Sequence, residues 1–171
     1  MKYTLNTHLH NFAVWTAARA VSRNFTTTAA VRGAIECTNL RELIDTDEEF
    51  TLDSFDEYHR STARSIVSFF QSLGGATSEK TSYGRAAKII AVYIKTIATI
   101  RDGRGSLAKF AHPPIDRILL TNLHKEYPLL NTNNINWTQL DEHSYFDLVE
   151  RLRTIKVDYF WELERFWSPE R

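Results

Sequence analysis

The scarcity of chain breakers between long helical segments is the feature that most constrains this fold. Only six glycines and four prolines occur in 171 residues. Between them, apolar residues recur at intervals of three and four, which is the period of an amphipathic helix and not of a strand. The sequence therefore predicts an all-α fold, an orthogonal bundle of six or seven helices in one domain covering residues 1–171.

Caps and breakers set the expected helix boundaries. The threonines at 26–28 are suited to cap the second helix, and Gly74-Gly75 to end the third in a left-handed conformation. The prolines at 113–114 are suited to start the fifth, and Thr138 to cap a later short helix. The expected helices cover residues 8–23, 29–38, 54–73, 83–100, 113–124 and 144–167, with loops at 76–80 and from 101 onwards.

The composition excludes several classes of protein. Hydrophobic residues make up 43% of the chain, charged residues make up 25%, and the formal net charge is zero, so any nucleic-acid surface must come from local clustering. The lone Cys37 excludes an internal disulfide and is expected to be a small buried residue. The N-terminus lacks the apolar region of a signal peptide, and the apolar run 86–100 contains two lysines. We therefore expect a cytoplasmic protein with no membrane contact.

An acidic block lies between residues 42 and 57. It contains no basic residue and eight acidic ones: Glu42, Asp45, Asp47, Glu48, Glu49, Asp53, Asp56 and Glu57. A nucleic-acid mimic or a cation site has this composition, and so has a solvated loop that leads into the acidic first turn of a helix. The loop is the favoured interpretation. Because glycine-rich phosphate loops and metal-binding motifs are absent from the sequence, no metal and no cofactor is predicted.

A basic region follows, between residues 80 and 117. Eight basic residues in it are opposed only by Asp102 and Asp116, which is typical of a phosphate-contacting face and equally of a solvated surface that balances the acidic block. Helical offsets of three and seven place Arg85, Lys88 and Lys95 on one side of their helix. The candidate nucleic-acid-binding residues are Arg85, Lys95, Arg101, Arg104, Lys109 and Arg117.

Lys88 and Asp116 are the candidate catalytic residues. Lys88 lies near the expected start of its helix, where the dipole and partial burial both lower the pKa of an amine and so increase its nucleophilicity. Asp116 lies at the start of the next helix, where a carboxylate accepts backbone N–H groups and stays ionised. A solvent-edge lysine and a plain helix cap explain the same residues without chemistry.

The segment Ala87-Lys88-Ile89-Ile90-Ala91-Val92, followed after a loop by His112-Pro113-Pro114-Ile115-Asp116-Arg117, resembles the C-terminal half of helix-hairpin-helix DNA glycosylases, most closely the 8-oxoguanine-excising and archaeal types. The likeness covers residues 84–117, and only Gly84 stands for the family's Gly-hydrophobic-Gly turn. The resemblance implies base excision from DNA, or a degenerate DNA-binding relative. It assigns nucleophilic attack on the sugar to Lys88 and charge stabilisation to Asp116.

An extruded base would need an apolar pocket beside these two residues. Tyr83, Tyr93 and Phe110 are the candidates to line it.

Two other functions stay open. Arg117 and His124, seven residues apart, resemble the Arg…His element of HEPN ribonucleases. A helical protein–protein interaction module, within a larger assembly or a homo-oligomer, is the non-enzymatic alternative, and it would use exposed aromatic side chains near the C-terminus. The aromatic residues there are Tyr159, Phe160, Trp161, Phe166 and Trp167.

Overall fold

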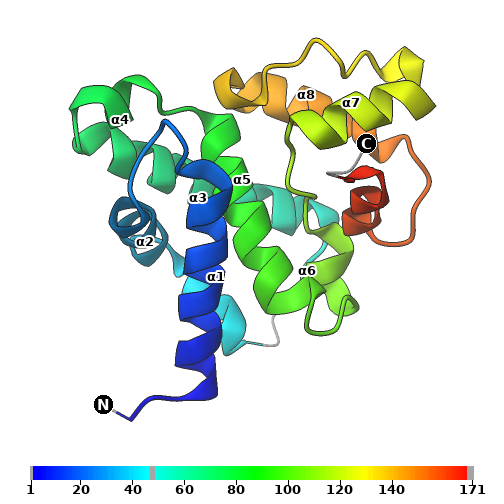
Figure 1. The fold of residues 1–171 in the computed structure, drawn as a ribbon. Coiled ribbons are helices and arrows are strands. Elements are labelled where there is room, and N and C mark those ends of the chain that lie inside the picture. The colour runs from blue at the N-terminus through cyan, green and yellow to red at the C-terminus, as the bar shows by residue number, and fades with distance from the viewer. Residues whose placement is uncertain (1, 47–48, 169–171) are drawn as a thin grey trace.

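The computed structural model describes residues 2–46 and 49–168, and in this part of the chain the regular secondary structure is all helical, without strands (Figure 1). The α-helices described are α1 (Leu5–Val21), α2 (Thr28–Glu36), α3 (Leu52–Ser72), α4 (Gly75–Glu79), α5 (Tyr83–Ile94), α6 (Gly105–Phe110), α7 (Arg117–Glu126) and α8 (Glu142–Arg153). The shorter segments are η1 (Asn39–Ile44), η2 (Lys95–Thr99), η3 (Pro128–Leu130), η4 (Trp137–Gln139) and η5 (Phe160–Phe166). The all-α prediction is confirmed, with more helices than the six or seven expected.

The start of α2 and the end of α3 follow the predicted caps, whereas α1 and α3 begin at Leu5 and Leu52, a few residues before the predicted 8 and 54. Thr27 accepts a hydrogen bond from the backbone N–H of Ala30 and so caps α2, and Gly74 takes up the left-handed φ of 69° that ends α3. Asp53 lies in the first turn of α3, as expected for the end of the acidic block. Asp47 and Glu48 of that block lie outside the described residues.

Several predicted boundaries are wrong from residue 76 onwards. Residues 76–80, expected as a loop, lie mostly in the short helix α4. In the loop expected from residue 101 onwards, residues 105–110 form the helix α6. The prolines at 113–114 lie in an extended segment, and α7 starts only after Asp116. The backbone of Asp116 is extended and its side chain accepts the N–H of Leu119, so this residue is the N-cap of the helix. Asn136, and not Thr138, caps η4.

The last predicted helix, 144–167, is divided in two. It ends at Arg153, and η5 begins at Phe160. The non-helical segment 154–159 separates the two helices, and Phe160 and Leu163 are buried where η5 packs against α6 and α7. This packing is a long-range effect that local periodicity does not reveal.

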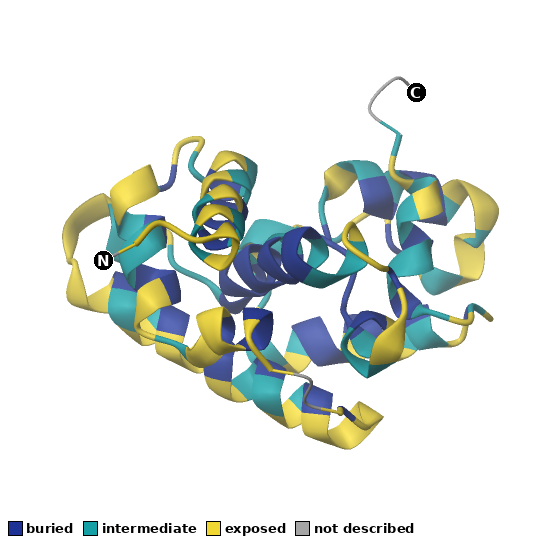
Figure 2. Cartoon of the chain, turned by 90° about the horizontal axis from the view of Figure 1, so that it is seen from below, coloured by how far each residue is buried: buried dark blue, intermediate teal, exposed yellow. Residues whose placement is uncertain are grey.

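Helix α5 is the centre of the bundle. It packs against α1, α3, α8 and η4, and the buried residues gather where the helices face one another (Figure 2). Small side chains permit the close approach of α1 and α5, since Ala13 and Ala17 are fully buried and Ala86 and Ala87 nearly so.

Three histidine–tyrosine pairs satisfy polar groups inside the core. The Nδ1 atoms of the histidines lie 2.8–3.0 Å from the tyrosine hydroxyl oxygens. The pairs are His10–Tyr93, His59–Tyr83 and His112–Tyr145. The rings of His59 and His112 also lie 4.6 Å apart, between centroids, so two imidazoles share one buried environment.

Two further expectations concern burial and membranes. Cys37 is exposed, contrary to the prediction that it is buried, because it lies just beyond the end of α2, where its Sγ bonds the carbonyl of Ala34. Among the described residues, none of the helices combines the length and apolar character needed to cross a bilayer.

Candidate active site: a buried lysine–aspartate pair

Lys88 and Asp116 meet at a cleft between α1, α5 and the start of α7. The Lys88 Nζ lies 3.0 Å from the Asp116 Oδ2, and the two side chains are 9% and 15% exposed. The cleft has a volume of about 260 Å³, and Thr16 and Ala20 of α1 form its opposite wall. The two residues proposed from sequence as nucleophile and carboxylate are thus in contact, although 28 positions separate them.

The start of α5 is fixed by a cap and by a glycine. The Ser82 side chain accepts a hydrogen bond from the N–H of Arg85, and the Gly84 N–H donates to the carbonyl of Leu140 at 2.9 Å. A Cβ on Gly84 would lie only 2.0 Å from the carbonyl oxygen of Trp137, so only glycine permits η4 to approach this closely. That approach brings the Trp137 ring to 4.5 Å from the Lys88 Nζ, a cation–π contact.

Asp116 uses both carboxylate oxygens. Its Oδ1 accepts the backbone N–H of Leu119 and so caps α7. Its Oδ2 accepts from Lys88 and also from the indole Nε1–H of Trp167, at 3.0 Å. The carboxylate is therefore fixed by a helix, a cation and an indole from three different parts of the chain.

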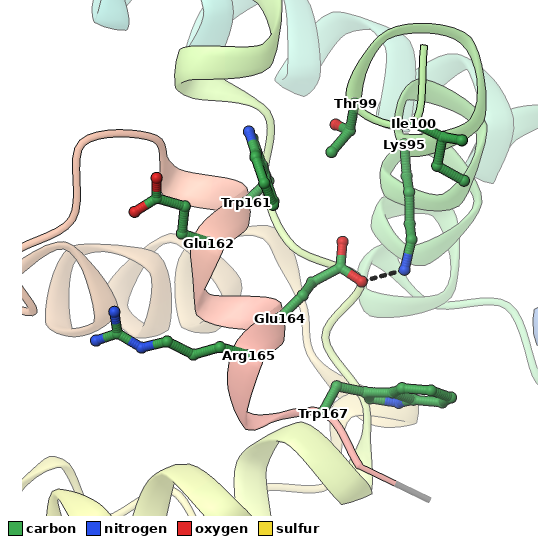
Figure 3. A pocket seen from close by; sticks show the side chains of 8 residues that line it. All are labelled: Lys95, Thr99, Ile100, Trp161, Glu162, Glu164, Arg165 and Trp167. Carbon is green, nitrogen blue, oxygen red and sulfur yellow. Dashed lines mark hydrogen bonds and ion pairs between the residues drawn. The ribbon is translucent and has the colours of Figure 1, made fainter. Parts of the chain in front are cut away.

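A second ion pair extends the cleft. Lys95 and Glu164 bond across the gap between the π-helical turn η2 and the 3₁₀-helix η5 (Figure 3). Trp161 and Trp167 lie on either side of this pair in the view, and a hollow of about 650 Å³ opens between them. Lys95, Glu164 and Trp167 line both this hollow and the cleft beside Lys88, so the two cavities are adjacent.

Burial shifts the ionisation of both pairs. Desolvation lowers the pKa of Lys88 from its ordinary value, and the Asp116 charge and hydrogen bond oppose that shift. Desolvation raises the pKa of Glu164, opposed by Lys95 and reinforced by the charge of Asp116. Lys88 is the sixth residue of α5, beyond the turn where a helix dipole acts strongly. The cause of its shift is therefore burial, and the dipole that the sequence suggested has little part in it.

The six candidate nucleic-acid-binding residues differ in how far they are exposed. Lys95 is half-buried in its pair with Glu164, and Arg85 is half-buried with its guanidinium 4.6 Å from the ring of Phe25. The other four are exposed, two of them beside Asp45 and Glu49 at a separate hollow on η1. These four are Arg101, Arg104, Lys109 and Arg117, of which Arg101 and Arg104 line that hollow.

The expected pocket aromatics lie elsewhere. Tyr83 and Tyr93 are buried against histidines, and Phe110 lines a different cavity beside Arg153. The aromatic side chains at the cleft are Trp137 and Trp167, neither of which was among the aromatic residues expected to line this pocket. Their partners are distant in the chain, so neither local spacing nor residue type could have identified them.

The alternative sites show no comparable contact. Arg117 and His124 occupy the first and last turns of α7, and in the described chain no hydrogen bond or ion pair joins them. Within residues 2–46 and 49–168, no group of three His, Cys, Asp or Glu side chains is placed to hold a metal ion. Of the C-terminal aromatics, Trp167 is 41% exposed, while the Trp161 indole donates to the carbonyl of Gly103.

No family model, curated protein or solved structure matches this chain.

Proposed function

We propose that this chain is a DNA glycosylase with lyase activity that forms a covalent intermediate through Lys88. The observation that carries the proposal is the contact between a buried lysine and a fixed carboxylate at an open cleft. The family that residues 84–117 resemble uses the same pair of residue types. Burial favours the uncharged amine, which is the nucleophilic form of a lysine.

The chemistry follows from the two side chains. The Lys88 amine attacks the sugar carbon that bears the base, and the bond between that carbon and the base nitrogen breaks with its electron pair leaving on the base. The Asp116 carboxylate stabilises the positive charge that develops on the sugar. The nitrogen of the new C–N bond passes one proton to the ring oxygen as the bond between that oxygen and the sugar carbon breaks, which gives an imine, and the expelled base takes a proton from water. Loss of a proton from the neighbouring sugar carbon then expels the 3′ phosphate, which is the lyase step. Water finally hydrolyses the imine, or borohydride reduces it to a stable amine.

The hollow between Trp161 and Trp167 is the proposed binding site of the extruded base. Its volume of about 650 Å³ is within the usual range for small-ligand sites, and indole rings supply stacking surfaces for a planar ring. The Lys95 ammonium donates and the Glu164 carboxyl accepts hydrogen bonds, so together they fit a base edge with adjacent acceptor and donor groups. The exposed cations Arg101, Arg104 and Arg117 are the proposed phosphate contacts.

The proposal is tested by base release and borohydride trapping on duplex DNA that carries one oxidised base or one abasic site. The wild-type protein should release the base and form a trapped adduct, and Lys88→Gln should do neither. Lys156→Gln is the matched control, since Lys156 is exposed and lines neither of the two cavities. No adduct from the wild-type protein, or an adduct that persists in Lys88→Gln, would reject the assignment.

A further inference from the structure

Glu164 lies at the boundary between the two cavities. It belongs to η5, near the end of the chain, and it lines both the cleft beside Lys88 and the hollow between Trp161 and Trp167. A nucleotide with its sugar at Lys88 and its extruded base in the hollow would pass this residue. Glu164 would then face the sugar carbon next to the one that the lysine attacks.

Three contacts fix Glu164 and the end of η5 in this place. The Glu164 Oε2 accepts a hydrogen bond from the Lys95 ammonium on η2. The Trp167 indole N–H donates to the Asp116 carboxylate at 3.0 Å. The side-chain amide of Asn122, on α7, donates to the last backbone carbonyl of η5 at 2.9 Å. The Glu164 carboxylate is therefore held beside the proposed nucleophile and its partner.

Glu164 and Asp116 supply the two carboxylates of the cleft, and they differ in how they are occupied. The Asp116 Oδ1 accepts the backbone N–H that starts α7, and its Oδ2 accepts from both Lys88 and Trp167. A proton that arrived at Oδ2 would have to displace one of these donors. Among the described residues, none donates to the Glu164 Oε1, and Figure 3 shows this oxygen turned away from the bond to Lys95.

The surroundings of Glu164 also increase its basicity. Its side chain is only 15% exposed. Burial raises the pKa of its carboxyl above the ordinary value, the Lys95 ammonium opposes this shift, and the charge of Asp116 adds to it. A carboxylate whose pKa is raised takes up a proton more readily than an exposed one at the same distance.

We infer that Glu164 is the general base of the lyase step, an inference that rests on the proposed function. Base release precedes this step, so the carboxylate is by then free of its proposed contact with the base. The imine carries a proton on the Lys88 nitrogen, which makes the hydrogens on the neighbouring sugar carbon acidic. The free oxygen of Glu164 takes one of these hydrogens as a proton.

The electrons of the broken C–H bond move towards the imine. They form a double bond between the two sugar carbons, while the electron pair of the C=N bond moves onto the nitrogen. The nitrogen pair then restores the imine, and the new double bond shifts to the next sugar carbon. The 3′ phosphate leaves that carbon with the electron pair of its C–O bond, and Glu164 finally releases the proton to water.

The first experiment separates imine formation from strand cleavage on duplex DNA with one abasic site, which requires no recognition of a base. Single-turnover reactions are divided: one half is reduced with borohydride to measure the adduct, and the other is analysed for cleavage. In Glu164→Gln, which keeps an acceptor for Lys95, the ratio of cleavage rate to trapping rate should fall at least about tenfold, because a general base typically contributes about 10²–10⁴-fold. Glu126→Gln is the matched control, since Glu126 is exposed and lines neither cavity.

The second experiment measures the same ratio as a function of pH. In the wild-type protein it should fall as the pH is lowered and Glu164 takes up a proton, and Glu164→Gln should lack this decline. A wild-type ratio and pH dependence in Glu164→Gln would overturn the inference and leave the proposed function standing. So would equal losses of adduct and cleavage, which would place Glu164 before the imine. No adduct from the wild-type protein would reject the proposed function and this inference together.

Discussion

Replacing Asp116 with asparagine should expose the energetic cost of the buried Lys88 ammonium. Asparagine still accepts the Leu119 N–H at the cap of α7 and keeps the size of the side chain. Its NH2 group then replaces Oδ2, so the change removes the negative charge and the acceptor of the Lys88 ammonium and the Trp167 indole N–H. Removing one partner of a buried ion pair typically costs about 3–5 kcal/mol.

The ordinary pKa of lysine sets an upper limit on the free-energy cost of leaving the Lys88 ammonium unpaired. A lysine of ordinary pKa 10.5 can escape an unpaired charge at pH 7 by losing its proton, at a cost of about 4.8 kcal/mol (1.36 kcal/mol for each of roughly 3.5 pH units). Burial already lowers the pKa of Lys88, so part of that cost is present in the wild-type protein. We therefore expect Asp116→Asn to lower the free energy of unfolding by about 2–4 kcal/mol at pH 7.

Urea denaturation of four proteins measures this quantity: the wild type, Asp116→Asn, Lys88→Met and the double variant. The double variant should be more stable than Asp116→Asn, because it leaves no unpaired ammonium. The deficit of Asp116→Asn should also narrow as the pH rises from 7 towards 10, since the ammonium that it strands then deprotonates. A loss below about 0.5 kcal/mol, no coupling in the cycle, or a deficit that does not depend on pH would refute the reasoning.

Two further predictions follow from the core and the start of α5. Gly84→Ala should displace Trp137, since the new Cβ would lie 2.0 Å from the carbonyl oxygen of Trp137. We expect the free energy of unfolding to fall by about 2–4 kcal/mol, and the indole fluorescence should report a changed environment for Trp137. Burial lowers the pKa of His59 well below its ordinary value and also lowers that of His112. The unfolded chain therefore takes up protons first as the pH falls, and we expect stability to drop by about 1 kcal/mol for His59 and by less for His112 between pH 7 and 5.5. Denaturation at the two pH values measures this loss, and the exposed His143→Asn variant should show the same loss; a stability independent of pH over this range would contradict the assignment of neutral buried imidazoles.

Local sequence signals accounted for much of the first half of the fold. The cap at Thr27 and the left-handed glycine at 74 lie where the sequence placed them, because these features depend on a few adjacent residues. Short helices such as α4 and α6 lack the length for a clear periodic signal. The break after Arg153 depends on contacts with α6 and α7, which the local pattern does not contain.

The candidate site was likewise predictable from local sequence only in part. The resemblance of residues 84–117 to a known family, together with residue type, singled out Lys88 and Asp116, and the fold brings them into contact. Trp167 and Glu164 reach the cleft from η5 at the far end of the sequence, so their roles depend on tertiary packing alone. Tyr83 and Tyr93 were aromatic residues near Lys88 in the sequence, but helical geometry directs them into the core.

The most direct test of the central claim is to locate the covalent bond. Protein trapped by borohydride on DNA with a single abasic site is digested with protease and nuclease, and the modified peptide is sequenced by mass spectrometry. The proposed function predicts a reduced sugar adduct on the Lys88 side chain. An adduct confined to any other amine, or the absence of an adduct under conditions where a known lyase gives one, would contradict it.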